Sequence, residues 1–312
     1  MKKNILIIKH GALGDVILAG AAMQAIRKHH MNENIICLTG KLYLEILKNS
    51  PWVDKVVIDY KPRWFNLRGW FKLRKFFSNN NFIKVYDLQT SYRSNIYFYL
   101  FCYLKNIPWS GIAYGSKYRQ SNINRKKMHT FDRHKDQLKL CGINYNNKPN
   151  WNWLSKKYKN DKLIPGNEFA IIVPGAAAHR HNKRWSKISY ANLINILSKM
   201  GIISLILGTI LDKKYIDDII NIIEDENKFK ALNYAGRTNF NDIVYLSSHA
   251  RFAIGNDTGP MHLIASNSLL TIVLFGSDSD PSLCAPIGKN VKIIQEKNIN
   301  DIKVDNILNY LQ

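Results

Sequence analysis

Short apolar runs alternate with amphipathic segments along the chain. Runs of four to seven mostly apolar residues are typical of strands buried in a parallel sheet, whereas apolar positions spaced three and four residues apart indicate helices. In the first half we predict strands over residues 4–9, 35–39, 55–59 and 82–88. A helix is predicted over residues 16–28, with one apolar face made of Val16, Ala19, Gly20, Ala22, Met23 and Ile26.

The second half repeats this alternation. We predict a helix over residues 186–200 and strands over residues 169–173, 202–207, 252–254 and 270–275. Residues 149–165 are polar and without a clear period, as expected of a connection between domains. The pattern predicts an α/β protein of two doubly wound domains, residues 1–160 and 161–312, facing a cleft. A last helix at about 301–312 can pack back on the N-terminal domain.

Aromatic residues concentrate in residues 96–104. Tyr97, Phe98, Phe101 and Tyr103 are expected to belong to the hydrophobic core, not to a cofactor site. Four widely separated cysteines form neither a disulfide framework nor a zinc pattern and fit a reducing cytoplasm. The apolar run after Met1 is interrupted at Lys9 and Asp15, which argues against a secretory signal.

The chain is strongly basic, with 45 Lys and Arg against 23 Asp and Glu and a formal net charge of +22. Part of the excess lies in residues 61–77, which contain no acid and interleave aromatic residues with Lys61, Arg63, Arg68, Lys72, Arg74 and Lys75. A solvated face and a face for a membrane surface or acidic substrate are both compatible with this pattern. Nucleic acid is not expected as a partner, because no recognition motif accompanies the charge.

The loop after the first strand, residues 9–15, has G-x-x-G spacing and lacks the dinucleotide fingerprint G-x-G-x-x-G. Asp15 stands where a helix begins, so its carboxylate is either an N-terminal cap or a general base.

Residues 255–262, G-N-D-T-G-P-M-H, lie between a strand and a helix. The first turn of a helix has free N–H groups and a partial positive charge, and glycine permits close approach, so this turn suits a diphosphate. A simple cap by Asp257 or Thr258 is the alternative. The loop at residues 174–185 joins small residues to basic ones, including His179 and Arg180, and suits phosphate in the same way.

Taken together, these segments resemble the ADP-heptose:lipopolysaccharide heptosyltransferases, glycosyltransferase family 9. The resemblance rests on I-L-I-I-K-H-G-A-L-G-D-V at 5–16, V-P-G-A at 173–176, K-R-W at 183–185 and A-G-R-T at 235–238. It continues with I-G-N-D-T-G-P-M-H-L-I-A at 254–265 and V-L-F-G at 273–276. It implies a GT-B fold whose N-terminal domain binds the acceptor and whose C-terminal domain binds the nucleotide sugar.

The resemblance also implies roles for single residues. Asp15 matches the family's proposed catalytic base, with Gly14 beside it, and Lys183 matches a lysine that contacts the donor diphosphate. The donor-binding turn corresponds to Asp257, Thr258, Gly259 and His262. We assign Asp257 to capping or sugar hydroxyl contacts, and His262 to phosphate contact or to shaping the turn.

Three features depart from the family pattern. Ser186 stands where proline is frequent, and the acidic ribose contact has only Asp212 as a weak counterpart. Asp278-Ser279-Asp280 resembles the D-x-D motif of metal-dependent glycosyltransferases, but it falls near a family turn, F-G-x-x-D-P. We therefore expect neither a metal nor another cofactor.

The resulting hypothesis is an inverting glycosyltransferase that moves heptose from ADP-heptose to a lipopolysaccharide core acceptor. The acceptor would be lipid A–Kdo or a heptosylated core, and the partners would be a nucleotide sugar, an anionic glycolipid and the inner-membrane surface. The expected location is the cytoplasm, peripheral on the inner membrane. Two alternatives stay open: a related transferase with another nucleotide sugar or a capsular or protein acceptor, and a non-catalytic binding protein.

Overall fold

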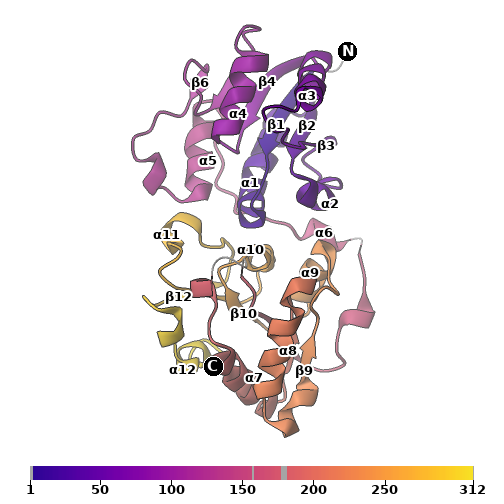
Figure 1. The fold of residues 1–312 in the computed structure, drawn as a ribbon, viewed down its shortest axis with the longest axis vertical. Helices are drawn as coiled ribbons and strands as arrows, with labels where there is room; N and C mark the ends of the chain where they lie inside the picture. Colours follow the sequence, from indigo (N-terminus) through magenta and orange to yellow (C-terminus); the bar gives the residue numbers. More distant parts are fainter. Residues whose placement is uncertain (1–2, 157, 177–180, 312) are drawn as a thin grey trace. The chain divides into compact units, whose positions relative to one another are not determined.

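The computed structural model describes residues 3–156, 158–176 and 181–311. The chain divides into two compact α/β units, with the boundary between Asn147 and Lys148. Each unit has a six-stranded sheet with parallel pairing throughout (Figure 1). Loop residues 177–180, which include His179 and Arg180 of the predicted phosphate-binding loop, lie outside the described residues.

In the first unit the strand order is β3-β2-β1-β4-β5-β6. The strands are β1 (Asn4–Lys9), β2 (Asn34–Thr39), β3 (Lys55–Ile58), β4 (Phe82–Asp87), β5 (Trp109–Gly111) and β6 (Tyr118–Arg119). The helices are α1 (Leu13–His29), α2 (Leu44–Leu47), α3 (Leu67–Asn79), α4 (Tyr92–Tyr97), the π-helical turn η2 (Phe98–Cys102) and α5 (Thr130–Lys139).

In the second unit the order is β12-β11-β10-β7-β8-β9. Its strands are β7 (Phe169–Val173), β8 (Ile203–Ile206), β9 (Ala231–Asn233), β10 (Ala253–Asn256), β11 (Thr271–Phe275) and β12 (Val291–Gln295). Its helices are α6 (Trp153–Lys156), α7 (Lys187–Lys199), α8 (Lys213–Ile222), α9 (Phe240–Ser247), α10 (Gly259–Ala265), α11 (Pro281–Cys284) and α12 (Val304–Leu308).

Continuous apolar strands form because both faces of each sheet are covered. The core of the first unit packs Leu6 and Ile8 of β1 and Ile36 of β2 against Leu73 and Phe77 of α3. Every strand predicted from the sequence is present, with ends shifted by at most two residues. The short strands β5, β6 and β9 and the half-exposed β12 were not predicted, because they lack a continuous apolar run.

The boundary between the units differs from the expected residue 160. Residues 148–160 belong to the second unit, because Trp151 and Leu154 are buried there and Asn160 Nδ2 donates to Asp242 Oδ1 over 2.9 Å. The last helix, α12, also packs within this unit, against α7. Its Ile307, and Ile302 just before the helix, are buried in the core of the unit.

The aromatic segment is only partly core. Tyr97, Phe98 and Phe101 are buried as predicted, but Tyr103 is 51% exposed, so that prediction was wrong for Tyr103. The N–H of Tyr103 donates to the carbonyl of Phe98, five residues earlier, over 2.9 Å. This wider π-helical turn shifts the following side chains away from α-helical spacing.

Candidate active site

The strand order of the second unit reverses between β7 and β10, because β8 continues on one side of β7 and β10 lies on the other. Ligands of open α/β sheets bind at the carboxyl ends of strands where the order reverses. Here these ends lead into the loop that contains Lys183 and into the turn Asp257-Thr258. The sheet thus brings the predicted donor residues to one edge.

Asn256, the last residue of β10, fixes the geometry of this edge. Its fully buried side-chain oxygen accepts hydrogen bonds from the backbone N–H of Trp185 over 3.2 Å and from the hydroxyl of Tyr190 over 2.9 Å. Its amide nitrogen donates to the carbonyl of Pro174 over 2.7 Å. One side chain therefore joins β10, the end of β7 and the loop that contains Lys183, and it was not among the predicted residues.

Lys183, Asp257 and His262 form one buried polar cluster. Lys183 Nζ lies 2.5 Å from Asp257 Oδ2, and His262 Nε2 lies 3.8 Å from Asp257 Oδ1. Burial opposes ionisation of Asp257, but the neighbouring His262 and the hydrogen-bonded ammonium of Lys183 outweigh burial and lower its pKa to about 2. At neutral pH Asp257 is therefore an anion that holds the ammonium of Lys183 beside the start of α10.

Thr258 and Gly259 lie where α10 begins. Thr258 is the extended N-cap residue, Gly259 is the first helical residue, and Pro260 lies in the first turn. The buried hydroxyl oxygen of Thr258 has no hydrogen-bond partner among the described residues. Together with the backbone N–H groups of a helix start, it offers donors that an anionic ligand can use.

Asp212 lies beside the loop that follows β7. Its carboxylate accepts hydrogen bonds from the backbone N–H of Thr209 over 2.9 Å and from the hydroxyl of Thr209 over 2.7 Å. Arg184 Nη2 lies 3.7 Å from Asp212 Oδ1, and a side chain at Gly175 would contact the same carboxylate. Asp212, the predicted ribose contact, thus borders the sheet edge where the predicted donor residues lie. It is next to Arg184, which was not among the predicted site residues.

Gly14 and Asp15 lie in the first unit, in the first turn of α1. Asp15 is half-buried, and its Oδ2 accepts a hydrogen bond from the backbone N–H of Ala12 over 3.3 Å. Gly11 of the same loop has φ +124° and packs against the ring of Tyr43, where any side chain would collide. Tyr43 also lies close enough to Asp15 for the carboxylate to contribute, after burial, to its raised pKa.

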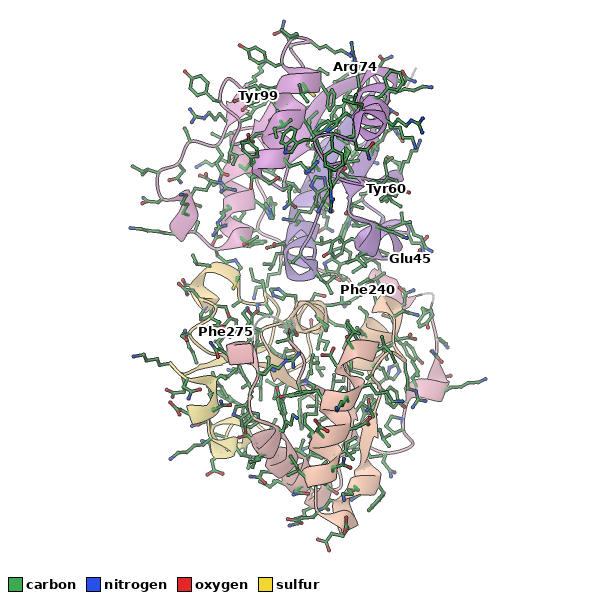
Figure 2. The ribbon with its side chains drawn as sticks, viewed as in Figure 1. Glu45, Tyr60, Arg74, Tyr99, Phe240 and Phe275 are labelled. Atoms are coloured by element: carbon green, nitrogen blue, oxygen red, sulfur yellow. The ribbon has the colours of Figure 1, made fainter. Side chains whose placement is uncertain are left out.

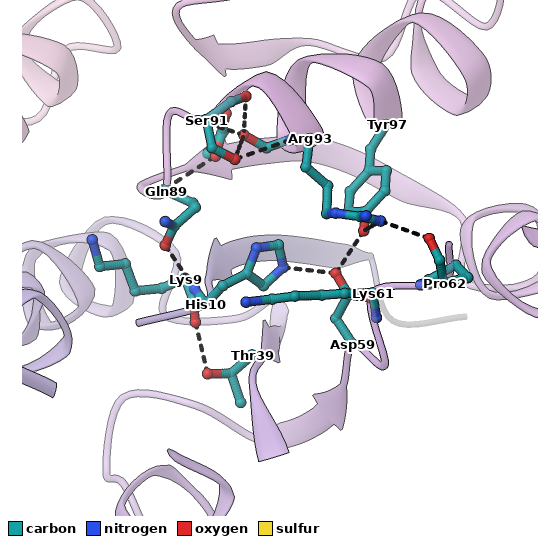
Figure 3. Close-up of polar contacts among 12 residues, drawn as sticks. Lys9, His10, Thr39, Asp59, Lys61, Pro62, Gln89, Ser91, Arg93 and Tyr97 are labelled. Carbon is teal, nitrogen blue, oxygen red and sulfur yellow. Dashed lines mark hydrogen bonds and ion pairs between the residues drawn. The ribbon is translucent and has the colours of Figure 1, made fainter. Parts of the chain in front are cut away.

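Polar residues at the ends of neighbouring strands surround this loop (Figure 3). His10 Nε2 lies 2.9 Å from Asp59 Oδ2, and both side chains are almost completely buried. The hydroxyl of Tyr97 donates to the same carboxylate over 2.7 Å. Neither His10 nor Asp59 was predicted to belong to the site. His10 directly follows β1, and Asp59 directly follows β3.

The six basic residues of the segment after β3 are all exposed: Lys61, Arg63, Arg68, Lys72, Arg74 and Lys75. In Figure 2, Arg74 of α3 and Tyr99 of η2 are labelled at the surface of the first unit. Trp64, Phe65, Leu67 and Phe71 are also more than 60% exposed, whereas Leu73 and Phe77 face the core. The segment therefore displays both charge and apolar area to its surroundings.

The structure thus divides the predicted site residues between the two units. Lys183, Asp257, Thr258, Gly259 and His262 come together at one sheet edge of the second unit, and Asp212 borders them. Gly14 and Asp15, together with the basic segment, belong to the first unit. Among the described residues no cluster of three or more His, Cys, Asp or Glu side chains is arranged to hold a metal ion.

Comparison with known proteins decides the family. A model of glycosyltransferase family 9 (heptosyltransferase) matches residues 70–309. The chain belongs to glycosyltransferase family 9. This family-9 enzyme is 23% identical over 309 residues to the lipopolysaccharide core heptosyltransferase OpsX of Haemophilus influenzae. The alignment covers 95% of this chain and 86% of OpsX.

Solved structures agree with the fold of the family-9 chain. The E. coli ADP-heptose lipopolysaccharide heptosyltransferase II superposes with a TM-score of 0.79 at 18% identity, covering 100% of this chain and 97% of the other. An E. coli heptosyltransferase with bound ADP gives a TM-score of 0.77 at 17% identity, covering 99% and 98%. The predicted GT-B class with two Rossmann-like units is confirmed, and no helix within the described ranges has the length and apolarity to cross a bilayer.

Proposed function

We propose that this glycosyltransferase moves heptose from ADP-heptose to the lipopolysaccharide core, with lipid A–Kdo or a heptosylated core as acceptor. Family membership and the similarity to a lipopolysaccharide core heptosyltransferase support the substrate class. The observation that carries the proposal is the cluster of Lys183, Asp257 and His262 at the start of α10. It supplies a preoriented cation beside free hydrogen-bond donors, which is what a departing nucleoside diphosphate needs.

In the proposed donor complex, Lys183 donates to the diphosphate and the start of α10, with Thr258 and Gly259, binds its oxygens. The ammonium of Lys183 also donates to Asp257, so the lysine is held in place before the donor arrives. Asp257 and its neighbour His262 orient the lysine and the turn, and Asp212 is the proposed ribose contact. These donors stabilise the charge that develops on ADP, and the proposal includes no metal.

In the proposed chemical step, Asp15 is the general base. It takes the proton of the acceptor hydroxyl while that oxygen bonds to the anomeric carbon of heptose. The bond between the anomeric carbon and the phosphate oxygen breaks, and ADP leaves from the opposite face, so the configuration inverts. Asp15 lies in the first turn of α1, directly after Gly14.

The exposed basic segment is the proposed acceptor and membrane face. Its cations can pair with phosphates of the glycolipid, and its exposed aromatic side chains can enter the headgroup region of a bilayer. We therefore propose a location on the cytoplasmic face of the inner membrane.

The donor is tested with a panel of nucleotide sugars. ADP-heptose is expected to raise the unfolding midpoint more than the other nucleotide sugars, because at equal concentration the ligand that binds the folded state most tightly stabilises it most. Lys183→Ala is expected to raise the donor KM by about tenfold, the loss of one charge-assisted hydrogen bond of ~1.4 kcal/mol. Lys187→Ala, which breaks the half-exposed pair with Asp218 nearby, is the matched control and should leave donor use unchanged. A stronger response to another nucleotide sugar would replace the proposed donor, and an unchanged Lys183→Ala enzyme would remove Lys183 from the site.

A further inference from the structure

The loop that begins at His10 and leads into the first turn of α1, where Asp15 lies, is held by the ends of three other strands. The hydroxyl of Thr39, at the end of β2, donates to the carbonyl of Lys9 over 2.6 Å. The backbone N–H of His10 donates to the side-chain oxygen of Gln89, after β4, over 2.8 Å. The imidazole of His10 completes the set through Asp59, after β3. The start of this loop is thus attached to segments at the ends of β2, β3 and β4 (Figure 3).

Asp59 has a second set of contacts, which leads into the basic segment. Its Oδ1 accepts a hydrogen bond from the backbone N–H of Lys61 over 2.7 Å, while its Oδ2 is bound by His10 and Tyr97. Lys61 has φ +48°, a left-handed conformation that is unfavourable for a residue with a side chain. The hydrogen bond that Lys61 donates to Asp59 stabilises this turn and so fixes the direction in which the chain leaves β3.

The next two residues are anchored as well. Arg93 Nη1 donates to the carbonyl of Pro62 over 3.2 Å, and the indole N–H of Trp70 donates to the carbonyl of Arg63 over 3.2 Å. Arg93 also lies 3.5 Å from the hydroxyl of Tyr97, which links this anchor to Asp59. The backbone of residues 61–63 is therefore fixed, while the side chains of Lys61 and Arg63 stay exposed.

The side chain of Asp59 is inaccessible, and that of His10 is 3% exposed. Neither can touch a substrate outside the unit. Burial opposes ionisation of Asp59, but its hydrogen bonds, that of His10 first, lower its pKa, so the carboxylate is charged and can accept several hydrogen bonds at once. An effect of Asp59 or His10 on the reaction must therefore pass through the segments that these two side chains hold in place.

We infer that Asp59, with His10 and Tyr97, is a positioning residue that couples the loop of the proposed base to Lys61 and Arg63, the first cations of the acceptor face. The network sets where the acceptor's anionic groups bind relative to Asp15. This inference rests on the proposed acceptor role of the basic segment, and it assigns to the pair no part in donor binding.

The test is a double-mutant cycle on acceptor kinetics. Asp59→Asn keeps the side-chain size but loses the charge that accepts from three partners, and it should raise the acceptor KM by about tenfold, a loss of ~1.4 kcal/mol. The dissociation constant of ADP should stay within about twofold, because the donor residues belong to the other unit. If Asp59 acts through Lys61, adding Lys61→Ala to Asp59→Asn should raise the acceptor KM little further, since coupled residues are not additive.

Two further variants keep the outcome decisive. Arg93→Gln removes the anchor on Pro62 from a more accessible position and should raise the acceptor KM in the same direction, even if Asp59→Asn fails to fold. Arg27→Gln is the matched control. Like Arg93, Arg27 donates to a backbone carbonyl, that of Glu33, and it also pairs with Asp54, but it lies at the end of α1 opposite to Asp15. It should leave the acceptor KM unchanged.

Three results would overturn the inference. One is an unchanged acceptor KM in Asp59→Asn and Arg93→Gln while Lys61→Ala raises it. Another is full additivity of Asp59→Asn and Lys61→Ala, which indicates a merely structural role. The third is a loss of kcat alone at saturating acceptor, which would put the pair in the chemical step. An unchanged KM in a Lys61→Ala, Arg63→Ala enzyme would instead remove the proposed acceptor role of the segment, and the inference with it.

Discussion

At the scale of single residues, the carboxylate of Asp257 organises the proposed donor-binding edge of the second sheet. It lies between the ammonium of Lys183 and the imidazole of His262, both nearly buried. Removing one partner of a buried pair leaves the other charge without compensation, so the cluster is sensitive to each member. The sequence indicated that Lys183 and Asp257 belong to one site, but their direct pairing depends on two loops that are 74 residues apart.

Asp257→Asn is expected to lower stability in a pH-dependent way. The folded-state pKa of about 2 lies below the ordinary value of 3.8, so the carboxylate stabilises the fold above pH 4 and loses this contribution as pH falls towards 2. The pH-dependent part of the difference from wild type should be on the order of 2 kcal/mol at pH 6 and vanish near pH 2. Urea unfolding of both proteins between pH 2 and 6 measures it. A difference that does not change over this range would contradict the assigned pairing.

At the scale of elements, the buried parallel strands were predictable because a strand covered on both faces must be apolar along its length. The carboxyl ends of these strands were also the right place to expect polar site residues. His10, Asp59 and Asn256 were nevertheless missed, since a buried polar side chain is stable only where partners from distant segments satisfy it. Those partners, such as Tyr97 for Asp59 and Trp185 for Asn256, leave no local pattern in the sequence.

Gly255→Ala tests the packing of β10 on β7. An added Cβ at Gly255 would lie 2.7 Å from both Cβ and the carbonyl oxygen of Val173, so the neighbouring strand must move. We expect a loss of about 1–3 kcal/mol in the free energy of unfolding, as for other overpacked cores, and weaker ADP binding, because Asn256 and Asp257 follow directly. Gly166→Ala, with open space around the added Cβ, is the control. Equal stability of the two variants would contradict the tight contact between β7 and β10.

At the scale of the whole molecule, the net charge is +22, and part of this charge lies in the basic segment of the first unit, residues 61–77, which contains no Asp or Glu. The family and the GT-B class followed from motifs spread over both halves, because the proposed donor and base residues lie in strand-end loops that carry strong local patterns. The proposed acceptor face was predicted from charge and exposed aromatic residues alone. Its anchoring to the loop of Asp15 could not, because it depends on contacts across the sheet.

Binding to anionic vesicles tests this face. A protein with Lys72, Arg74 and Lys75 changed to Ala should bind vesicles containing anionic phospholipid about a hundredfold more weakly than wild type at low salt, because each basic residue near the surface contributes about 1 kcal/mol before screening. Binding should also weaken as salt is added. The control changes three exposed lysines of the second unit, Lys213, Lys214 and Lys289, and so alters net charge equally. Equal loss in both triple variants would show that total charge, and not the basic segment, governs attraction.

The most direct test of the account compares heptose transfer by wild type and by Asp15→Ala, with ADP-heptose and a core acceptor at saturating concentration. Asp15→Ala is expected to lose turnover by at least about a hundredfold, the lower range for removal of a general base, while it binds ADP-heptose as wild type does. Full transfer activity in Asp15→Ala, or no transfer of heptose by the wild-type protein, would contradict the proposed reaction.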